Sequence, residues 1–198
     1  MSEPSLRVLV AEDESLIRMD LVEMLGELGY AVVGQAMNGQ VAVDLAAELR
    51  PDVVLMDVAM PVRDGLSAAS EIIASKLAPV VMVTAFSEPD TVTHAAQAGA
   101  LGYIVKPFNR SDLGPAIELA VARWAQMLDL EQQVDDLAAR VRARDVVDEA
   151  KAVLQSQHGL SEAEAFALLR RRAMDARVTL AEVAAQVIGG SAPAADRR

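Results

Sequence analysis

Hydrophobic and polar residues alternate along the first part of the chain in a pattern that predicts repeated strand–helix units. Short, almost continuously apolar stretches are typical of strands buried on both faces of a parallel sheet. Stretches of helical period follow them, and Gly29, Pro51 and Gly99 mark their ends. The expected strands span 6–13, 30–36, 52–57, 79–85 and 100–106, and the expected helices span 15–29, 39–49, 65–76 and 88–98, with another from an N-cap at Ser111. The alternation predicts an α/β domain built on a five-stranded parallel sheet.

The pattern changes to purely helical after Pro115. No glycine or proline then occurs before Gly159, and apolar residues keep a spacing of three and four. This spacing predicts a coiled-coil-like seam of about two heptads. Its members are Met127, Leu130, Val134, Leu137 and Val141. The seam either joins two copies of the chain or folds back on its own chain, and the helix either continues or bends near Arg144.

Three later apolar stripes predict a small three-helix bundle. They fall within 147–154, 165–169 and 178–187. Ser161 and Thr179 are the expected N-caps of the second and third helices. Phe166 lies on the second stripe, where packing in the core is favoured over stacking on a base. The expected divisions are a first domain over 5–122, a helical linker over 123–143, a helical domain over 138–190 and a disordered tail over 191–198.

Charge is distributed unevenly between these parts. Residues 1–122 hold 17 acidic and 7 basic side chains, whereas residues 123–198 hold 12 and 11. The net charge of −11 argues against nucleic-acid binding by the whole surface, but the nearly neutral second part can meet a polyanion. The chain has no cysteine and no apolar run of membrane-spanning length, and its N-terminus lacks a signal-peptide core. A soluble cytoplasmic protein without membrane contact is expected.

Chemically reactive side chains lie at the ends of four of the predicted strands. Glu12 and Asp13 end the first, Asp57 ends the third, Thr84 lies at the end of the fourth, and Lys106 ends the fifth. The carboxyl ends of parallel strands share one edge, so these groups should meet there. Clustered carboxylates need a cation, and oxygen ligands suit Mg²⁺. A carboxylate is also a nucleophile for phosphoryl transfer, which predicts an acyl phosphate on Asp57. The alternative is an ordinary α/β domain with helix-capping acids.

The motifs at this edge resemble the receiver domain of two-component response regulators over about residues 5–122. They are "AEDE" at 11–14, "LMDVAMPVRDG" at 55–65, "TA" at 84–85 and "KPF" at 106–108. The resemblance implies a flavodoxin-like fold with strand order 2-1-3-4-5. It also implies that a sensor histidine kinase phosphorylates Asp57, that the signal leaves through the face of the fourth helix, and that the Lys106–Pro107 peptide is cis.

The same resemblance implies a role for each site residue. Asp13 and Asp57 would bind Mg²⁺ together with the backbone carbonyl of Ala59, and Glu12 would bind it through water. Contacts to the phosphate would come from Thr84 and Lys106. Tyr103 occupies the position of the family's switch aromatic, for which simple packing is the alternative.

The second part resembles the ANTAR domain, an RNA-binding module of transcription antitermination regulators, over about residues 138–190. The matching features are Ala150, Lys151, Gly159, "SE" at 161–162, Ala165, Phe166, "LLR" at 168–170, Ala173, Leu180, Val183 and Ala184. Ala152 departs from the family, which more often has glycine there. The resemblance implies binding of paired RNA stem-loops in nascent leader transcripts, which prevents termination. The candidate RNA contacts are Lys151, Arg170, Arg171 and Arg172.

Paired stem-loops suggest two copies of the second part, so a phosphorylation-dependent homodimer through the seam is a hypothesis. DNA binding and docking on another protein are the alternative outputs. The stretch "TLAEVAAQVIGG" at 179–190 is similar to the first half of a helix-turn-helix, but no recognition helix follows it. Residues after 122 offer no nucleophile–base pair, so an enzymatic output is not expected.

Overall fold

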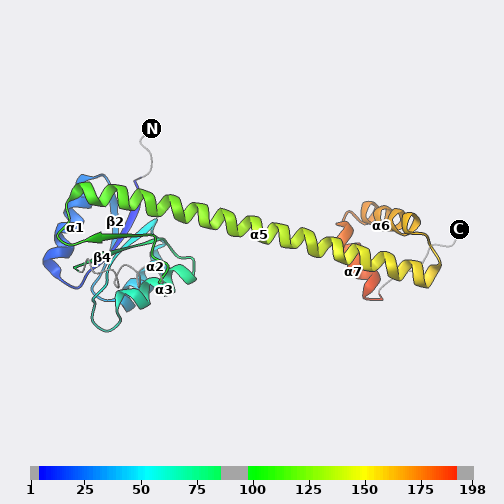
Figure 1. Cartoon of the computed structure of the whole chain (residues 1–198), viewed down its shortest axis with the longest axis horizontal. Helices are drawn as coiled ribbons and strands as arrows, with labels where there is room; N and C mark the ends of the chain where they lie inside the picture. Colours follow the sequence, from blue (N-terminus) through cyan, green and yellow to red (C-terminus); the bar gives the residue numbers. More distant parts are fainter. Residues whose placement is uncertain (1–4, 86–97, 191–198) are drawn as a thin grey trace. The chain divides into compact units, whose positions relative to one another are not determined.

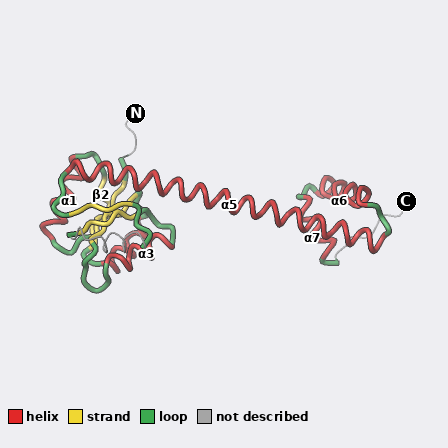
Figure 2. Tube along the Cα trace, in the orientation of Figure 1, coloured by secondary structure: helices red, strands yellow, loops and turns green. Residues whose placement is uncertain are grey.

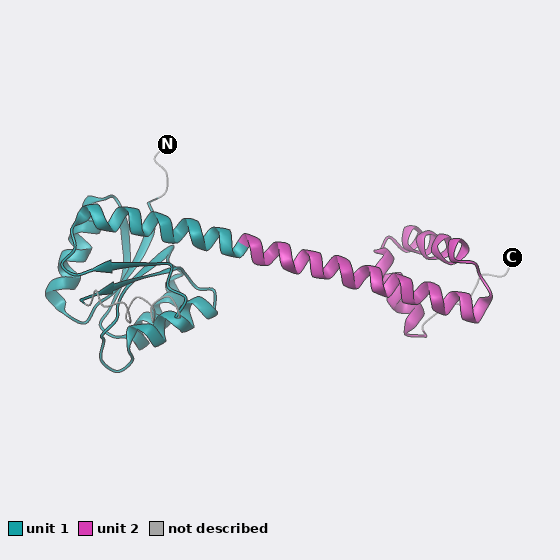
Figure 3. Ribbon diagram, viewed as in Figure 1, with its two compact units in different colours: residues 1–128 teal, residues 129–198 magenta. Residues whose placement is uncertain are grey.

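The structure is a computed structural model that describes residues 5–85 and 98–190. It divides into two compact units, residues 1–128 and 129–198 (Figure 3). The helix expected over 88–98 and the disordered tail expected over 191–198 fall wholly or largely outside the described residues. Among the helices of the described residues, none is long and apolar enough to cross a membrane.

A five-stranded parallel sheet forms the centre of the first unit. Its strand order is β2-β1-β3-β4-β5, which confirms the predicted topology. The strands are β1 (Arg7–Ala11), β2 (Ala31–Ala36), β3 (Val53–Asp57), β4 (Val80–Thr84) and β5 (Gly102–Val105). Every residue of β3 and β4 is buried, which explains why these strands read as unbroken apolar runs.

Helices cover both faces of this sheet (Figures 1 and 2). On one face, α2 (Gly39–Leu49) and α3 (Gly65–Ala74) enclose a core that includes Leu9 and Met56. On the other face, α1 (Ser15–Glu27) and the first turns of α5 (Arg110–His158) enclose a core that includes Leu55. Alternate residues of β1, β3 and β4 thus pack into the two cores, and the doubly wound architecture is confirmed.

The helix α5 follows the continuous alternative that the sequence pattern left open. It begins at Arg110 instead of after a cap at Ser111, because Asn109 Oδ1 accepts a hydrogen bond from the Ser111 backbone N–H at 2.9 Å. It then runs without interruption to His158, so the alternative of a bend near Arg144 is not observed. The predicted linker and the first helix of the bundle are therefore parts of one helix.

Three helices make up the core of the second unit, as predicted. The C-terminal part of α5 packs with α6 (Glu162–Ala176) and α7 (Leu180–Ile188) around a core that includes Leu154 and Leu169. Ser161 and Thr179 form capping boxes with Glu164 and Glu182, as their sequence spacing suggests. The hydrogen bonds to Ser161 and to Thr179 lower the pKa of Glu164 and of Glu182.

Candidate functional site

The structure brings the predicted reactive residues of the first unit to one edge of the sheet. Asp57 is the last residue of β3 and Thr84 the last of β4, while Glu12 and Lys106 directly follow β1 and β5. Strand register places Asp57 opposite Val83, so these strand ends are level. A pocket of about 160 Å³ opens there, lined by Asp13, Glu14, Asp57, Val58, Ala59, Thr84, Ala85 and Lys106.

Three carboxylates gather at this pocket. One oxygen each from Glu12, Asp13 and Asp57 lies within 4.8 Å of the others. Glu12 is fully buried, Asp57 is buried and Asp13 is exposed. Burial raises the pKa of Glu12; the Lys106 hydrogen bond opposes this shift and the Asp57 charge adds to it. The site therefore holds acidic charge in surroundings that disfavour it.

Lys106 is the cation that this cluster already contains. Its Nζ lies 2.7 Å from Glu12 Oε2 and 2.9 Å from Asp57 Oδ1. Burial lowers the pKa of Lys106, but its hydrogen bonds to Glu12 and Asp57 outweigh burial and the net shift is upward. The other Asp57 oxygen, Oδ2, accepts a hydrogen bond from the Ala59 backbone N–H at 3.2 Å. Both carboxylate oxygens of Asp57 are thus held in place. The peptide bond between Lys106 and Pro107 is cis, as the resemblance to receiver domains implies.

The donor set fits a divalent cation such as Mg²⁺. Its side-chain ligands are carboxylates only, and hard cations prefer oxygen. If all groups are ionised, three carboxylates and the Lys106 ammonium leave a net charge of −2, which a divalent ion balances. The exposed Asp13 lies on the open side of the cluster, where a hydrated ion has access.

Two residues of this site were not assigned a role from the sequence. Arg18, on α1, donates from Nη1 to the Glu12 carbonyl at 2.6 Å and so holds the chain just after β1. Gly65 lies so close to Asp57 that a Cβ at this position would be 1.9 Å from the Asp57 carbonyl oxygen. Its occurrence in the "LMDVAMPVRDG" motif was a sequence signal, but only the structure gives the reason.

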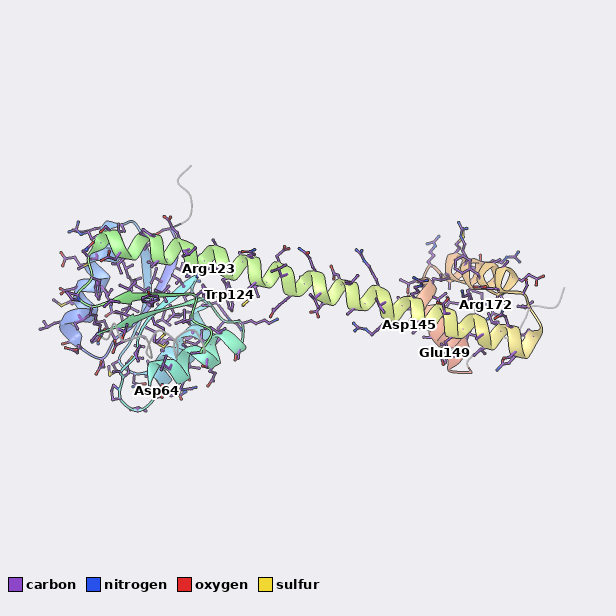
Figure 4. The ribbon with its side chains drawn as sticks, viewed as in Figure 1. Asp64, Arg123, Trp124, Asp145, Glu149 and Arg172 are labelled. Carbon is purple, nitrogen blue, oxygen red and sulfur yellow. The ribbon has the colours of Figure 1, made fainter. Side chains whose placement is uncertain are left out.

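The loop that contains this close approach is also fixed by hydrogen bonds. Gly65 N–H donates to the Val58 carbonyl at 2.9 Å. Asp64, which is labelled in Figure 4, caps α3 by accepting from the Ser67 backbone N–H at 2.9 Å. That backbone hydrogen bond, with a second from the Ser67 hydroxyl, lowers the pKa of Asp64. The loop after β3 therefore holds Asp57 at the pocket wall.

Tyr103 is not among the residues that line the pocket. It lies on β5, paired in register with Met82, and its side chain is half exposed. Thr84, by contrast, is buried at the pocket wall. Of the two proposed switch residues, the structure thus places only Thr84 in the site.

In the second unit, Lys151 is engaged in ion pairs within the bundle. Its Nζ lies 2.7 Å from Asp148 Oδ1 and 2.8 Å from Glu162 Oε1, so it ties α5 to the first turn of α6. The hydrogen bond to Asp148, and to a smaller extent the one to Glu162, raises the pKa of Lys151. Its charge is already balanced by two acids, which distinguishes it from the arginines of α6.

Those arginines occupy different positions around α6. Arg170 and Arg171 are exposed and line a surface groove, whereas Arg172 is partly buried. Figure 4 labels Arg172 on α6 and Asp145 and Glu149 on α5. Phe166 is 42% exposed, so the expectation that it packs in the core is wrong. The neighbouring Ala165 and Leu169 fill the core position instead.

Comparison with known proteins extends over both units. The family model of the response regulator receiver domain matches residues 8–118, and that of the ANTAR domain matches residues 135–188. The chain is 54% identical over 182 residues to the transcriptional regulatory protein PdtaR of Mycobacterium tuberculosis, covering 92% of this chain and 89% of that protein. It is 38% identical over 112 residues to the chemotaxis protein CheY of Thermotoga maritima, covering 56% of this chain and 93% of that protein.

Solved structures resemble the first unit. The signal receiver domain of the response regulator NarL from Mycobacterium tuberculosis aligns with a TM-score of 0.58 and 31% identity, covering 61% of this chain and 98% of that one. A chain of the CheX-CheY-BeF3-Mg²⁺ complex from Borrelia burgdorferi aligns with a TM-score of 0.53 and 26% identity, covering 57% of this chain and 86% of that one.

Proposed function

Because this chain is a two-component response regulator with a receiver domain and an ANTAR domain, we propose that it accepts a phosphoryl group on Asp57 and responds by binding RNA. The observation that carries the first half is the pocket in which Asp57 meets Glu12, Asp13, Thr84 and Lys106. The residue ranges proposed for the domains are 5–122 for the receiver and 138–190 for the RNA-binding domain, joined by the helical segment 123–143.

In the proposed phosphotransfer, an Asp57 carboxylate oxygen attacks the phosphorus of a kinase phosphohistidine. The new O–P bond forms as the P–N bond breaks, and the imidazole leaves. Lys106, which lies 2.9 Å from Asp57 Oδ1 before the transfer, is drawn toward the developing phosphate charge, and Thr84 contributes its hydroxyl. The domain acts only on its own phosphorylation and dephosphorylation, and it is not an enzyme for another substrate.

Mg²⁺ supplies the remaining positive charge for this chemistry when it is bound. We assign Asp13, Asp57 and the backbone carbonyl of Ala59 as its ligands, with Glu12 binding through water. The acidic cluster supports this assignment, as does the presence of Mg²⁺ in the similar CheX-CheY-BeF3 complex. Asp13 provides the accessible carboxylate, while Lys106 offsets the charge of the buried pair.

Phosphorylation adds about −1.5 to −2 charges at the pocket. Thr84 and Lys106 move toward this charge, and Tyr103 turns inward from its half-exposed position. The signal then leaves through the face of β4, β5 and the intervening segment, part of which lies outside the described residues.

The output we propose is binding of RNA hairpins in nascent leader transcripts, which prevents termination. The ANTAR match and the exposed Arg170 and Arg171 support it. Lys151 and Arg172 are secondary candidates, since Lys151 already binds two acids and Arg172 is partly buried. The ANTAR match favours RNA over DNA as the nucleic acid bound.

We expect the phosphorylated chain to bind an RNA with two adjacent hairpins, and not a duplex DNA of the same sequence. Replacing Arg170 and Arg171 together with alanine should weaken RNA binding about 15-fold near 0.15 M salt, because two phosphate contacts are lost. Fluorescence anisotropy over a salt series measures both effects, and the log–log salt slope should fall by about 1.4.

Arg142→Ala is the matched control, since it removes one exposed arginine from α5. A loss of affinity per arginine equal to that in the α6 variant would indicate unspecific charge attraction. Preference of the parent chain for DNA, or no binding in either phosphorylation state, would exclude the RNA function and leave docking on another protein.

We also propose that phosphorylation shifts the chain from monomer to homodimer through α5. Leu130, Val134, Leu137 and Val141 are all more than half exposed. In a heptad frame with Met127 at position a, both valines fall at a and both leucines at d. This combination favours a parallel coiled coil of two helices. An exposed apolar seam of this composition is suited to a second copy of itself.

The dimer hypothesis predicts a change in mass. Light scattering should report 21.0 kDa without phosphodonor and about twice that with phosphodonor and Mg²⁺. Leu137→Asp should keep the chain monomeric, because a dimer would bury the new charge in its seam. Ala139→Asp places the same charge on the opposite side of the helix and should still allow the dimer to form. An unchanged mass in the phosphorylated parent would refute the hypothesis.

A further inference from the structure

The solvent-facing side of α6 carries a shallow groove that the receiver chemistry does not use. Its volume is about 350 Å³. It is lined by Phe166, Ala167, Arg170, Arg171, Met174 and Asp175. The buried residues of α6 are Ala165, Leu169 and Ala173, so the groove lies on the side of the helix away from the bundle core.

The apolar part of this groove is an aromatic ring and a thioether. Phe166 is 42% exposed and Met174 is 70% exposed, although both are large hydrophobic side chains. Phe166 is also the only aromatic residue in the sequence after Trp124. Exposed apolar side chains that lie together in a groove commonly mark a binding surface.

The positive charge of the groove comes from Arg170 and Arg171. Arg170 is four residues from both Phe166 and Met174, so the three form one line along the helix. Among the described residues, neither Arg170 nor Arg171 has an ion pair within 4.0 Å, in contrast to Lys151 with its two acids. Asp175 lies at one end of the groove and repels anions there.

We propose that this groove is a subsite for one unpaired base of an RNA loop. The base stacks on the Phe166 ring, and Arg170 and Arg171 bind the adjoining phosphates. Unpaired bases of RNA loops are read in this way, by stacking on aromatic rings and guanidinium planes. The inference rests on the proposed RNA binding. It adds that Phe166 distinguishes an unpaired loop base from a paired stem base, because paired bases cannot reach the ring.

The test uses the full-length phosphorylated chain and two-hairpin RNAs with 2-aminopurine at one loop position at a time. Stacking quenches this base, so fluorescence at one loop position should change on binding. Phe166→Leu should abolish that change and weaken binding about tenfold, whereas Phe166→Tyr should preserve both. Because Phe166 lies outside the core cluster, thermal unfolding should be similar in all three proteins.

The outcomes separate this inference from the proposed function. Unchanged affinity and unchanged fluorescence in Phe166→Leu, with normal RNA binding by the parent, would overturn the stacking subsite alone. Failure of the parent chain to bind RNA would overturn both. Equal loss of affinity in Phe166→Leu and Phe166→Tyr, without a fluorescence change at any position, would also reject stacking.

Discussion

Asp57→Asn should abolish incorporation of phosphate from acetyl phosphate or from a histidine kinase. The amide is not a nucleophile for phosphorus, and it weakens the carboxylate cluster that we assign to Mg²⁺. Phosphate-affinity gel electrophoresis would show one unshifted band under conditions in which the parent chain is fully shifted. The loss should be complete, because the neighbouring Glu12 is fully buried and paired with Lys106.

Asp64→Asn is the matched control for this variant. Asp64 also follows β3 and is also an aspartate, but it caps α3, and asparagine caps helices equally well. It should therefore be phosphorylated like the parent. Persistent phosphorylation of Asp57→Asn would mean that another carboxylate, with the exposed Asp13 first in line, is the acceptor.

Gly65→Ala should destabilise the first unit by roughly 3 kcal/mol, at the upper end of the usual cost of overpacking. The added Cβ would lie 1.9 Å from the Asp57 carbonyl oxygen, which is backbone at the end of a buried strand and cannot easily move. The midpoint of thermal unfolding, followed by circular dichroism, should fall by about 15 °C. Phosphorylation should also slow, because relief of the clash displaces Asp57.

Gly26→Ala provides the comparison. A Cβ at Gly26, within α1, would meet no atom within 4 Å, and alanine is favoured over glycine in a helix by about 1 kcal/mol. Its unfolding temperature should be equal to or above that of the parent. Parent-like stability and phosphorylation of Gly65→Ala would show that the loop after β3 adapts freely and that glycine is not required at this position.

The fold and most of the receiver site could be predicted from local sequence pattern. A buried parallel strand must be apolar throughout, and a helix that packs on it must be apolar on one side. The order of strands and helices can therefore be predicted from the local pattern of apolar residues. Once the strands are parallel, their carboxyl ends share an edge. For that reason the sequence alone assigns Glu12, Asp13, Asp57, Thr84 and Lys106 to one site.

The tertiary structure decided how individual side chains are used. On α6, Ala165 and Phe166 are neighbours on one broad apolar stripe, and only packing against α5 and α7 determines that Ala165 is buried and Phe166 exposed. Lys151 looks like a free cation in sequence, but Glu162, eleven residues away, reaches it only in the folded bundle.

The same distinction holds at the phosphorylation site. The Gly65 requirement comes from the backbone of Asp57 eight residues earlier, brought against it by the loop after β3. The hydrophobic periodicity of a sequence predicts which residues are buried, because each helix or strand turns its apolar residues away from water. It does not record which atoms meet, because those contacts depend on how elements pack after they have formed.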